Sequence, residues 1–104
     1  MMGEFDKIQY SINFFEKKIL SKFLTLSNPK VVLELGIDKG STTKYILNHI
    51  KKNNLKAKLY GFDLGEKIRN LENTDESIKS FLNNNHLQFI KGSLPESLNN
   101  FLIK

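Results

Sequence analysis

The chain has 104 residues, of which 39% are hydrophobic and 26% charged, and its formal net charge is +5. This length allows one domain with a small core. The absence of cysteine excludes a disulfide framework and a thiolate metal site, and no apolar run is long enough to cross a membrane. The N-terminus carries acids and has no apolar block after a basic start, so we expect no secretory signal and a cytoplasmic protein.

The positive charge comes from lysine, because fifteen lysines are spread along the chain and Arg69 is its single arginine. Proteins that read nucleic acids favour arginine for bidentate contacts with phosphate and guanine. The densest group, Lys51–Lys58, is interpreted as the polar end of a helix and the loop after it. The composition therefore predicts solvated helix surfaces and argues against a nucleic-acid partner.

A helix is predicted over residues 4–26, because apolar side chains recur there at three- and four-residue steps. Its apolar stripe consists of Phe5, Ile8, Ile12, Phe15, Ile19, Phe23 and Leu26. Asn28 and Pro29 end this helix. The next segment, Val31–Leu35, is apolar until its glutamate, which is typical of a strand covered on both faces.

Strands alternate with helices through the core, residues 31–104. The expected elements are a helix over Ser41–Asn53, a strand over Leu59–Leu64, a helix over Asp75–Asn84, a strand over Leu87–Lys91 and a last helix that has Pro95 in its first turn. The polar segment Glu66–Thr74 is left unassigned.

This alternation predicts a parallel sheet with right-handed crossovers. We therefore expect an α/β fold: a Rossmann-like, doubly wound sheet with only its first three strands present, preceded by an N-terminal helix, in one domain of residues 1–104. Because parallel sheets are normally covered on both faces, the first and last helices are the candidates for the second face. The first strand is expected to present an unpaired edge.

The turn after the first strand carries the main chemical signal. A dinucleotide fingerprint needs G-x-G-x-x-G, but counting from Gly36 the second glycine is replaced by Asp38, whose charge would oppose a diphosphate. The P-loop pattern also fails, because no Gly-Lys-Ser/Thr closes the loop at the required spacing. The pattern present is E-x-G-x-x-x-G, formed by Glu34, Gly36 and Gly40. It suits a cofactor without phosphate that carries a cation, an amino acid head and an adenosine, and Glu34 would attract the ammonium group directly or through water.

Two further sites follow the second and third strands. Asp63 lies 23 residues after Gly40, where doubly wound folds place an acid that accepts hydrogen bonds from ribose hydroxyls. Gly92 and Ser93 lie where an adenine ring would sit, and Ser93 is either an adenine contact or a cap of the following helix. We predict no catalytic residue and no metal ligand.

In these segments the chain resembles the class I S-adenosylmethionine-dependent methyltransferases. The segments VVLELGIDKGSTT, LYGFDLG and LQFIKGSLPESL carry the resemblance, and the last is most similar to the macrocin and rhamnosyl O-methyltransferase-like branch. The resemblance covers Phe5–Lys104 and the front half of a family member. It implies cofactor contacts at Glu34, Gly36 and Gly40, a ribose contact at Asp63 and an adenine ring near Gly92 and Ser93. Many members have an acid where this chain has Ser93.

The predicted function is therefore the cofactor-binding half of an enzyme that moves a methyl group from S-adenosylmethionine to a small molecule or sugar. The catalytic and substrate-binding half is expected to be missing. The alternative is a non-catalytic α/β module that associates with a partner, or with itself as a homo-oligomer, through the open sheet edge. A basic nucleic-acid-binding domain is the third hypothesis.

Overall fold

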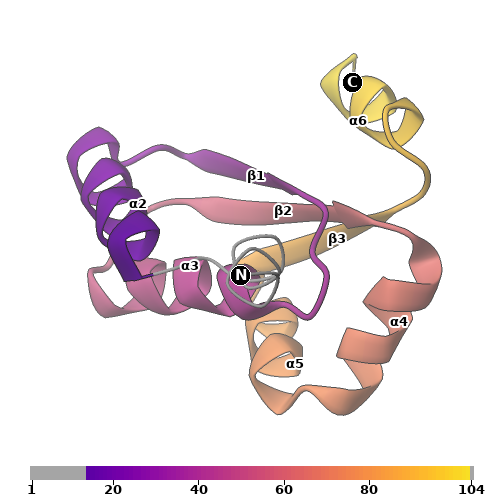
Figure 1. Cartoon of the computed structure of the whole chain (residues 1–104), viewed down its shortest axis with the longest axis horizontal. Helices are drawn as coiled ribbons and strands as arrows, with labels where there is room; N and C mark the ends of the chain where they lie inside the picture. Colours follow the sequence, from indigo (N-terminus) through magenta and orange to yellow (C-terminus); the bar gives the residue numbers. More distant parts are fainter. Residues whose placement is uncertain (1–13, 104) are drawn as a thin grey trace, which may run out of the picture.

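The computed structural model describes residues 14–103 and contains one parallel sheet with its strands in the order β1-β2-β3 (Figure 1). The strands are β1 (Val31–Leu35), β2 (Lys58–Asp63) and β3 (Leu87–Lys91), and the helices are α2 (Phe14–Ser27), α3 (Ser41–Lys52), α4 (Gly65–Thr74), α5 (Glu76–Asn83) and α6 (Glu96–Leu102). The predicted α/β fold with three parallel strands and a preceding helix is confirmed. Residues 4–13 of the predicted first helix lie outside the described residues. No helix within residues 14–103 combines the length and the apolar character that a membrane span needs.

The inner face of the sheet, as we call the side packed on α3, α4 and α5, carries the main hydrophobic core. The strand register aligns Val32 with Leu59 and Leu59 with Leu87, and all three side chains pack into one cluster with α3 and α5. Leu59 is completely buried, and burial of such a side chain contributes about 2 kcal/mol. This core packs near the amino ends of the three strands, and the parallel register brings their carboxyl ends to one edge of the sheet.

Helix α2 also lies on the inner side, so the expectation that it covers the second face of the sheet is wrong. Leu24 of α2 is buried in the same cluster as α3. The hydroxyl of Ser21 bonds the hydroxyl of Tyr45, and Thr25 Oγ1 bonds His49 Nε2 at 2.8 Å. These contacts, which join α2 to α3, decide the position of α2.

The apolar stripe predicted for the first helix is only partly correct, because the described part of the stripe points outward. Ile19, Phe23 and Leu26 are exposed, whereas Leu24 is buried and Leu20 packs partly against the core. The buried side of α2 is therefore rotated by about one residue from the predicted stripe. The pattern identified an amphipathic helix but not the side that α3 would cover.

Helix α4 occupies the segment that the sequence left unassigned. Its buried side chains, Ile68 and Leu71, pack with Ile37 of the turn after β1 and with Phe89 of β3. Asp75 separates α4 from α5 and caps α5, since its carboxylate accepts a hydrogen bond from the backbone N–H of Ile78 at 3.2 Å. The two helices therefore cover the inner face beside α3.

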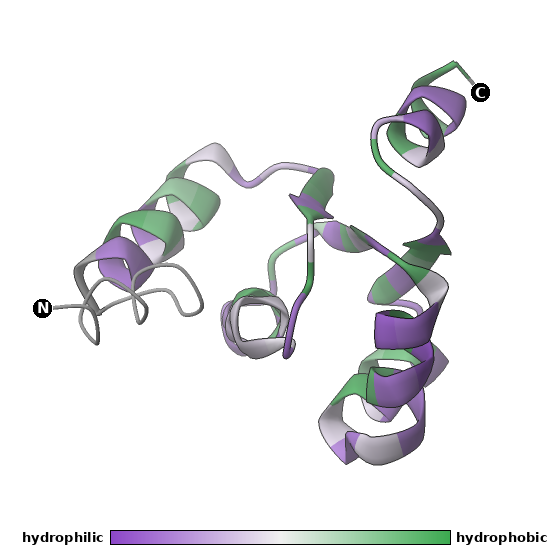
Figure 2. Ribbon diagram, turned by 45° about the vertical axis from the view of Figure 1, so that its right-hand side comes forward, coloured by the Kyte–Doolittle hydropathy of each residue, from purple (hydrophilic) through white to green (hydrophobic). Residues whose placement is uncertain are grey.

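The outer face of the sheet is the side on which α6 lies, opposite α4 and α5 (Figure 2). Phe101 of α6 packs on this face, with its ring centroid 4.9 Å from that of Tyr60 and 5.5 Å from that of Phe62. On β1, Leu33 and Leu35 remain 37% and 53% exposed. The predicted last helix is thus on the second face, but among the described elements it covers that face only in part.

Candidate functional site

The glycine turn joins the end of β1 to the start of α3. Gly36 and Gly40 have φ angles of +84° and +82°, which glycine adopts without a steric penalty. The backbone N–H of Gly36 donates to the carbonyl of Phe62 at 2.8 Å, and that of Gly40 donates to the carbonyl of Ile37 at 2.9 Å. A Cβ on Gly36 would meet no atom within 4 Å. The backbone at Gly36 is therefore accessible to a ligand.

Glu34 lies on β1 with its side chain directed toward α3. Its Oε1 accepts a hydrogen bond from Thr43 Oγ1 at 2.5 Å, and Thr43 is itself completely buried. Burial raises the pKa of Glu34 to about 7; the bond from Thr43 opposes this rise, and the charge of Asp63 adds to it. The carboxyl group is thus poised between its neutral and ionised forms near neutral pH, and a cation beside it would favour the ionised form.

Asp63, at the end of β2, holds the glycine turn in place. Its Oδ2 accepts from the backbone N–H groups of Ile37 at 2.8 Å and Asp38 at 3.2 Å, and its Oδ1 accepts from that of Leu64 at 2.7 Å. Burial favours the neutral acid, but these bonds and the charge of Lys67 outweigh it and lower the pKa of Asp63. Three of its roughly four acceptor positions are therefore already used, and the freer oxygen is Oδ1.

The structure brings several predicted residues to one edge of the sheet. Glu34 and Asp63 are close enough for the charge of one to affect the pKa of the other, and the turn that contains Gly36 is bonded to Asp63. Gly92, after β3, donates its backbone N–H to the carbonyl of Asp63 at 3.1 Å. Gly40 lies deeper, at the start of α3, where a Cβ would be 3.4 Å from the side chain of Leu71.

Ser93 is placed differently from the acids. Together with Gly92 it lines a groove beneath α6 on the outer face, and this groove contains neither Glu34 nor Asp63. The hydroxyl of Ser93 does not cap α6, because the residue at the cap position is Pro95 and the helix has no side-chain cap bond. An adenine contact at Ser93 remains a prediction.

Several residues that contribute to this edge were missed in the sequence. Thr43 positions Glu34, and Leu64 and Leu94 are exposed apolar residues that follow β2 and β3. Asp38 has a φ angle of +51°; its Oδ1 lies 3.7 Å from Lys67 Nζ, while its Oδ2 is buried without a hydrogen-bond partner. A leucine directly after a strand-ending acid was the available signal for Leu64. The unsatisfied oxygen of Asp38 has no signature in the sequence.

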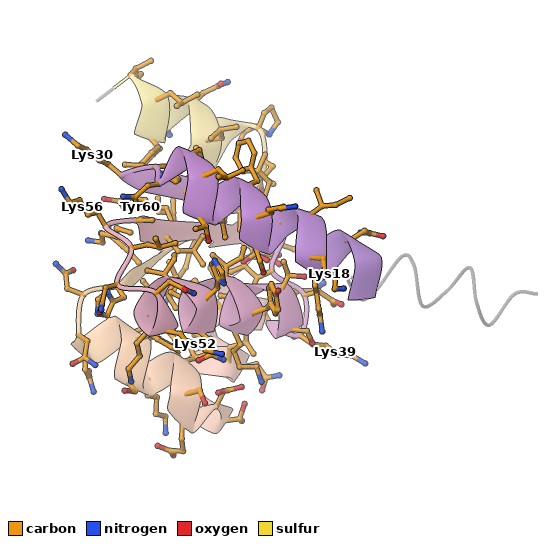
Figure 3. All side chains as sticks on the ribbon, turned by 90° about the vertical axis from the view of Figure 1, so that its left-hand side faces the viewer. Lys18, Lys30, Lys39, Lys52, Lys56 and Tyr60 are labelled. Atoms are coloured by element: carbon orange, nitrogen blue, oxygen red, sulfur yellow. The ribbon has the colours of Figure 1, made fainter. Side chains whose placement is uncertain are left out.

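The lysines do not form one concentrated patch at this site. Lys39 lies in the glycine turn, Lys52 at the end of α3, and Lys30 and Lys56 in loops, and Figure 3 shows these side chains at separate points of the surface. Within residues 14–103, no group of three or more histidine, aspartate or glutamate side chains is arranged to hold a metal ion. No protein-family model, curated protein or solved structure matches the chain.

Proposed function

We propose that this chain forms the cofactor-binding part of a class I S-adenosylmethionine-dependent methyltransferase with a Rossmann-like, doubly wound fold. The observation that carries the proposal is the pairing of two acids, Glu34 and Asp63, around the open backbone of Gly36. The unsatisfied Oδ2 of Asp38 also supports it, because a buried acceptor without a partner calls for a donor. When bound, S-adenosylmethionine would supply a methyl group activated by a positively charged sulfur.

Glu34 is the residue we assign to the cationic amino acid head of the cofactor. Burial raises the pKa of Glu34 to about 7, so both of its forms are populated near neutral pH. A nearby ammonium group would then stabilise the carboxylate. Thr43 keeps the side chain in one orientation through its hydrogen bond to Oε1. Binding of a positively charged ligand would thus favour ionisation of Glu34, whereas binding of a neutral ligand would not.

Asp63 is assigned to the ribose hydroxyls through Oδ1, the oxygen that accepts only one backbone N–H among the described contacts. The exposed side chains of Leu64 and Leu94 offer apolar surface for an adenine ring at the same edge. Gly92 and Ser93 belong to the loop that we expect one edge of the adenine ring to contact. Methyl transfer to a hydroxyl of a small molecule or sugar also needs a base for that hydroxyl, a role to which we assign none of the described residues.

Isothermal titration calorimetry with S-adenosylmethionine tests this proposal on the 104-residue chain. We expect saturable binding that weakens about 10-fold or more in Asp63→Ala and Asp63→Asn, because hydrogen bonds to charged groups contribute about 1.5–3 kcal/mol. Since Asp63 also holds the turn, Glu34→Gln serves as a second variant that leaves the bonds of Asp63 in place. Glu76→Gln is the charge-matched control, on an exposed side chain of α5. The assignment is wrong if the wild type gives no binding heat or if the site variants match the control.

Association through β1 is a second candidate function, favoured by the exposure of that strand. Among the described strands β1 pairs with β2 alone, and Val31, Leu33 and Leu35 on its outer face are 50%, 37% and 53% exposed. A second copy in antiparallel orientation would place Leu33 opposite its own equivalent and Val31 opposite Leu35, which continues the apolar row across a two-fold axis. The partner in this case is an identical chain, and the product is a homo-oligomer.

Light scattering over a range of concentrations tests this association. The wild type is expected to form dimers as the concentration rises, whereas Leu33→Lys should stay monomeric because a charge would interrupt the shared apolar row. Leu94→Lys changes an exposed leucine away from β1 and provides the control. A monomeric wild type at the highest concentration would exclude this function.

A further inference from the structure

A groove of about 710 Å³ lies between α6 and the outer face of β2 and β3, beside the contact that Phe101 makes with the sheet. Tyr60, Gln88 and Ile90 supply its floor from the strands, and Ser97, Asn100 and Phe101 supply its wall from α6. This volume lies within the range of about 300–1,000 Å³ that is typical of small-molecule sites. Figure 1 shows α6 at the end of the segment that follows β3.

The groove differs from the proposed cofactor site. Residues of a strand point alternately to opposite faces, so Tyr60 lies on the outer face while Asp63 points to the inner face and bonds the glycine turn. The lining of the groove includes Gly92 and Ser93 but none of Glu34, Gly36 and Asp63. The groove therefore borders the proposed adenine edge at the Gly92–Ser93 loop, but it shares no contact with Glu34, Gly36 or Asp63.

One side of the groove is an aromatic wall with a fixed geometry. The ring of Phe101 is inclined at 53° to that of Tyr60 and at 86° to that of Phe62. Phe62 is completely buried in the sheet, so it anchors Phe101 from below. These contacts restrain the rings, so Phe101 offers apolar ring surface to an aromatic ligand at little entropic cost.

The groove also offers uncharged polar groups beside these rings. The hydroxyl oxygen of Ser97 is buried and has no hydrogen-bond partner, although buried hydroxyl groups normally have one. Gln88 and Asn100 add carboxamides, each with donors and an acceptor; the Gln88 oxygen accepts from Lys58 at 3.3 Å. A ligand with both a donor and an acceptor would satisfy Ser97 and pair with these amides.

Charges of both signs border the groove, so they favour neither an anion nor a cation as the ligand. Lys58 Nζ lies 5.2 Å from the centroid of the Tyr60 ring. Lys91, at the end of β3, forms an ion pair with Glu72 of α4, with 3.3 Å between Nζ and Oε1. Glu96 contributes a carboxylate to the lining, and its negative charge would repel a carboxylate on the ligand. We propose that this groove binds a flat aromatic molecule that carries an uncharged amide or hydroxyl group. The proposal does not depend on the methyltransferase assignment.

Nuclear magnetic resonance titration of the ¹⁵N-labelled chain tests the proposal with three small probes. Benzamide has the proposed chemistry, benzoate replaces its amide by a charge, and cyclohexanecarboxamide removes its flat ring. We expect benzamide to cause saturable shifts at Gln88, Ser97 and Asn100, and the other two probes to bind at least about 5-fold more weakly. Equal binding of all three, or no saturable shift at these residues, would overturn the proposal.

Two variants separate a specific site from an unspecific apolar crevice. Ser97→Ala removes the unsatisfied hydroxyl and should weaken benzamide binding by about 5-fold, which is the usual effect of one hydrogen bond. Ser80→Ala is the matched control on the exposed side of α5 and should leave it unchanged. An unchanged affinity in Ser97→Ala would contradict the proposed role of this residue.

Competition with S-adenosylmethionine distinguishes the two proposals. The groove and the strand-end site share only the Gly92–Ser93 loop, and the proposed benzamide contacts at Gln88, Ser97 and Asn100 lie outside the cofactor site. Saturation with S-adenosylmethionine should therefore change the benzamide affinity by less than about 2-fold. Full competition would show one shared site and overturn the assignment of a separate one. If S-adenosylmethionine does not bind at all, the benzamide titration by itself still tests whether the groove binds a ligand.

Discussion

The substitution Glu34→Gln tests the electrostatics of the strand-end site through protein stability. Burial raises the pKa of Glu34 from 4.5 to about 7, so between these values the folded chain keeps a proton that the unfolded chain has lost. Stability therefore falls as pH rises through this window and levels off above pH 7, while below pH 4.5 both states are protonated. At about 1.36 kcal/mol for each pH unit, the loss amounts to about 3 kcal/mol.

Urea denaturation of the wild type and of Glu34→Gln between pH 4.5 and 8 measures this contribution. Glutamine keeps an oxygen that can accept the hydrogen bond from Thr43 but cannot ionise. The difference in the free energy of unfolding should therefore move by about 3 kcal/mol in favour of Glu34→Gln across this pH range. Groups that titrate equally in both proteins cancel in this difference.

Parallel stability curves for the two proteins would refute the reasoning. A difference that varies by less than about 0.5 kcal/mol from pH 4.5 to 8 would mean that the pKa of Glu34 is close to its ordinary value in the folded chain. In that case the side chain would be solvated, and it would not be poised to ionise when a cation binds.

Three further predictions concern the same edge and the groove. If S-adenosylmethionine binds to the ionised form of Glu34, the Kd measured by calorimetry should fall about 10-fold from pH 6 to pH 8 in the wild type, and a similar fall in Glu34→Gln would contradict this role. Gly36→Ala should lower the free energy of unfolding by about 1–2 kcal/mol in urea, because its positive φ strains any residue with a Cβ; no loss would mean that the turn relaxes. Thr43→Val should destabilise the chain by about 1–2 kcal/mol by leaving Glu34 without its donor, whereas Ser97→Ala should be nearly neutral because its hydroxyl has no partner to lose. Thermal denaturation of both variants would contradict this comparison if the two losses were equal.

Much of the fold could be read from local patterns. The strands Val31–Leu35 and Leu87–Lys91 were predicted with the bounds that the structure has. Each is a short apolar run bounded by glycine, proline or asparagine, residues that favour turns and end the neighbouring helices. Helix α4 was missed because only Ile68 and Leu71 mark its buried side within a polar segment.

The sequence by itself determined the order of strands and helices, the glycine turn and the presence of acids at two strand ends, since each depends on neighbouring residues and their backbone preferences. Only the tertiary structure decided which side of the sheet α2 packs on, which backbone N–H groups the carboxylate of Asp63 accepts from and why the pKa of Glu34 is raised. These properties arise from contacts between segments far apart in the chain, such as the bond between Ile37 and Asp63, which are 26 positions apart. Burial and hydrogen-bond partners of this kind have no local pattern from which they could be predicted.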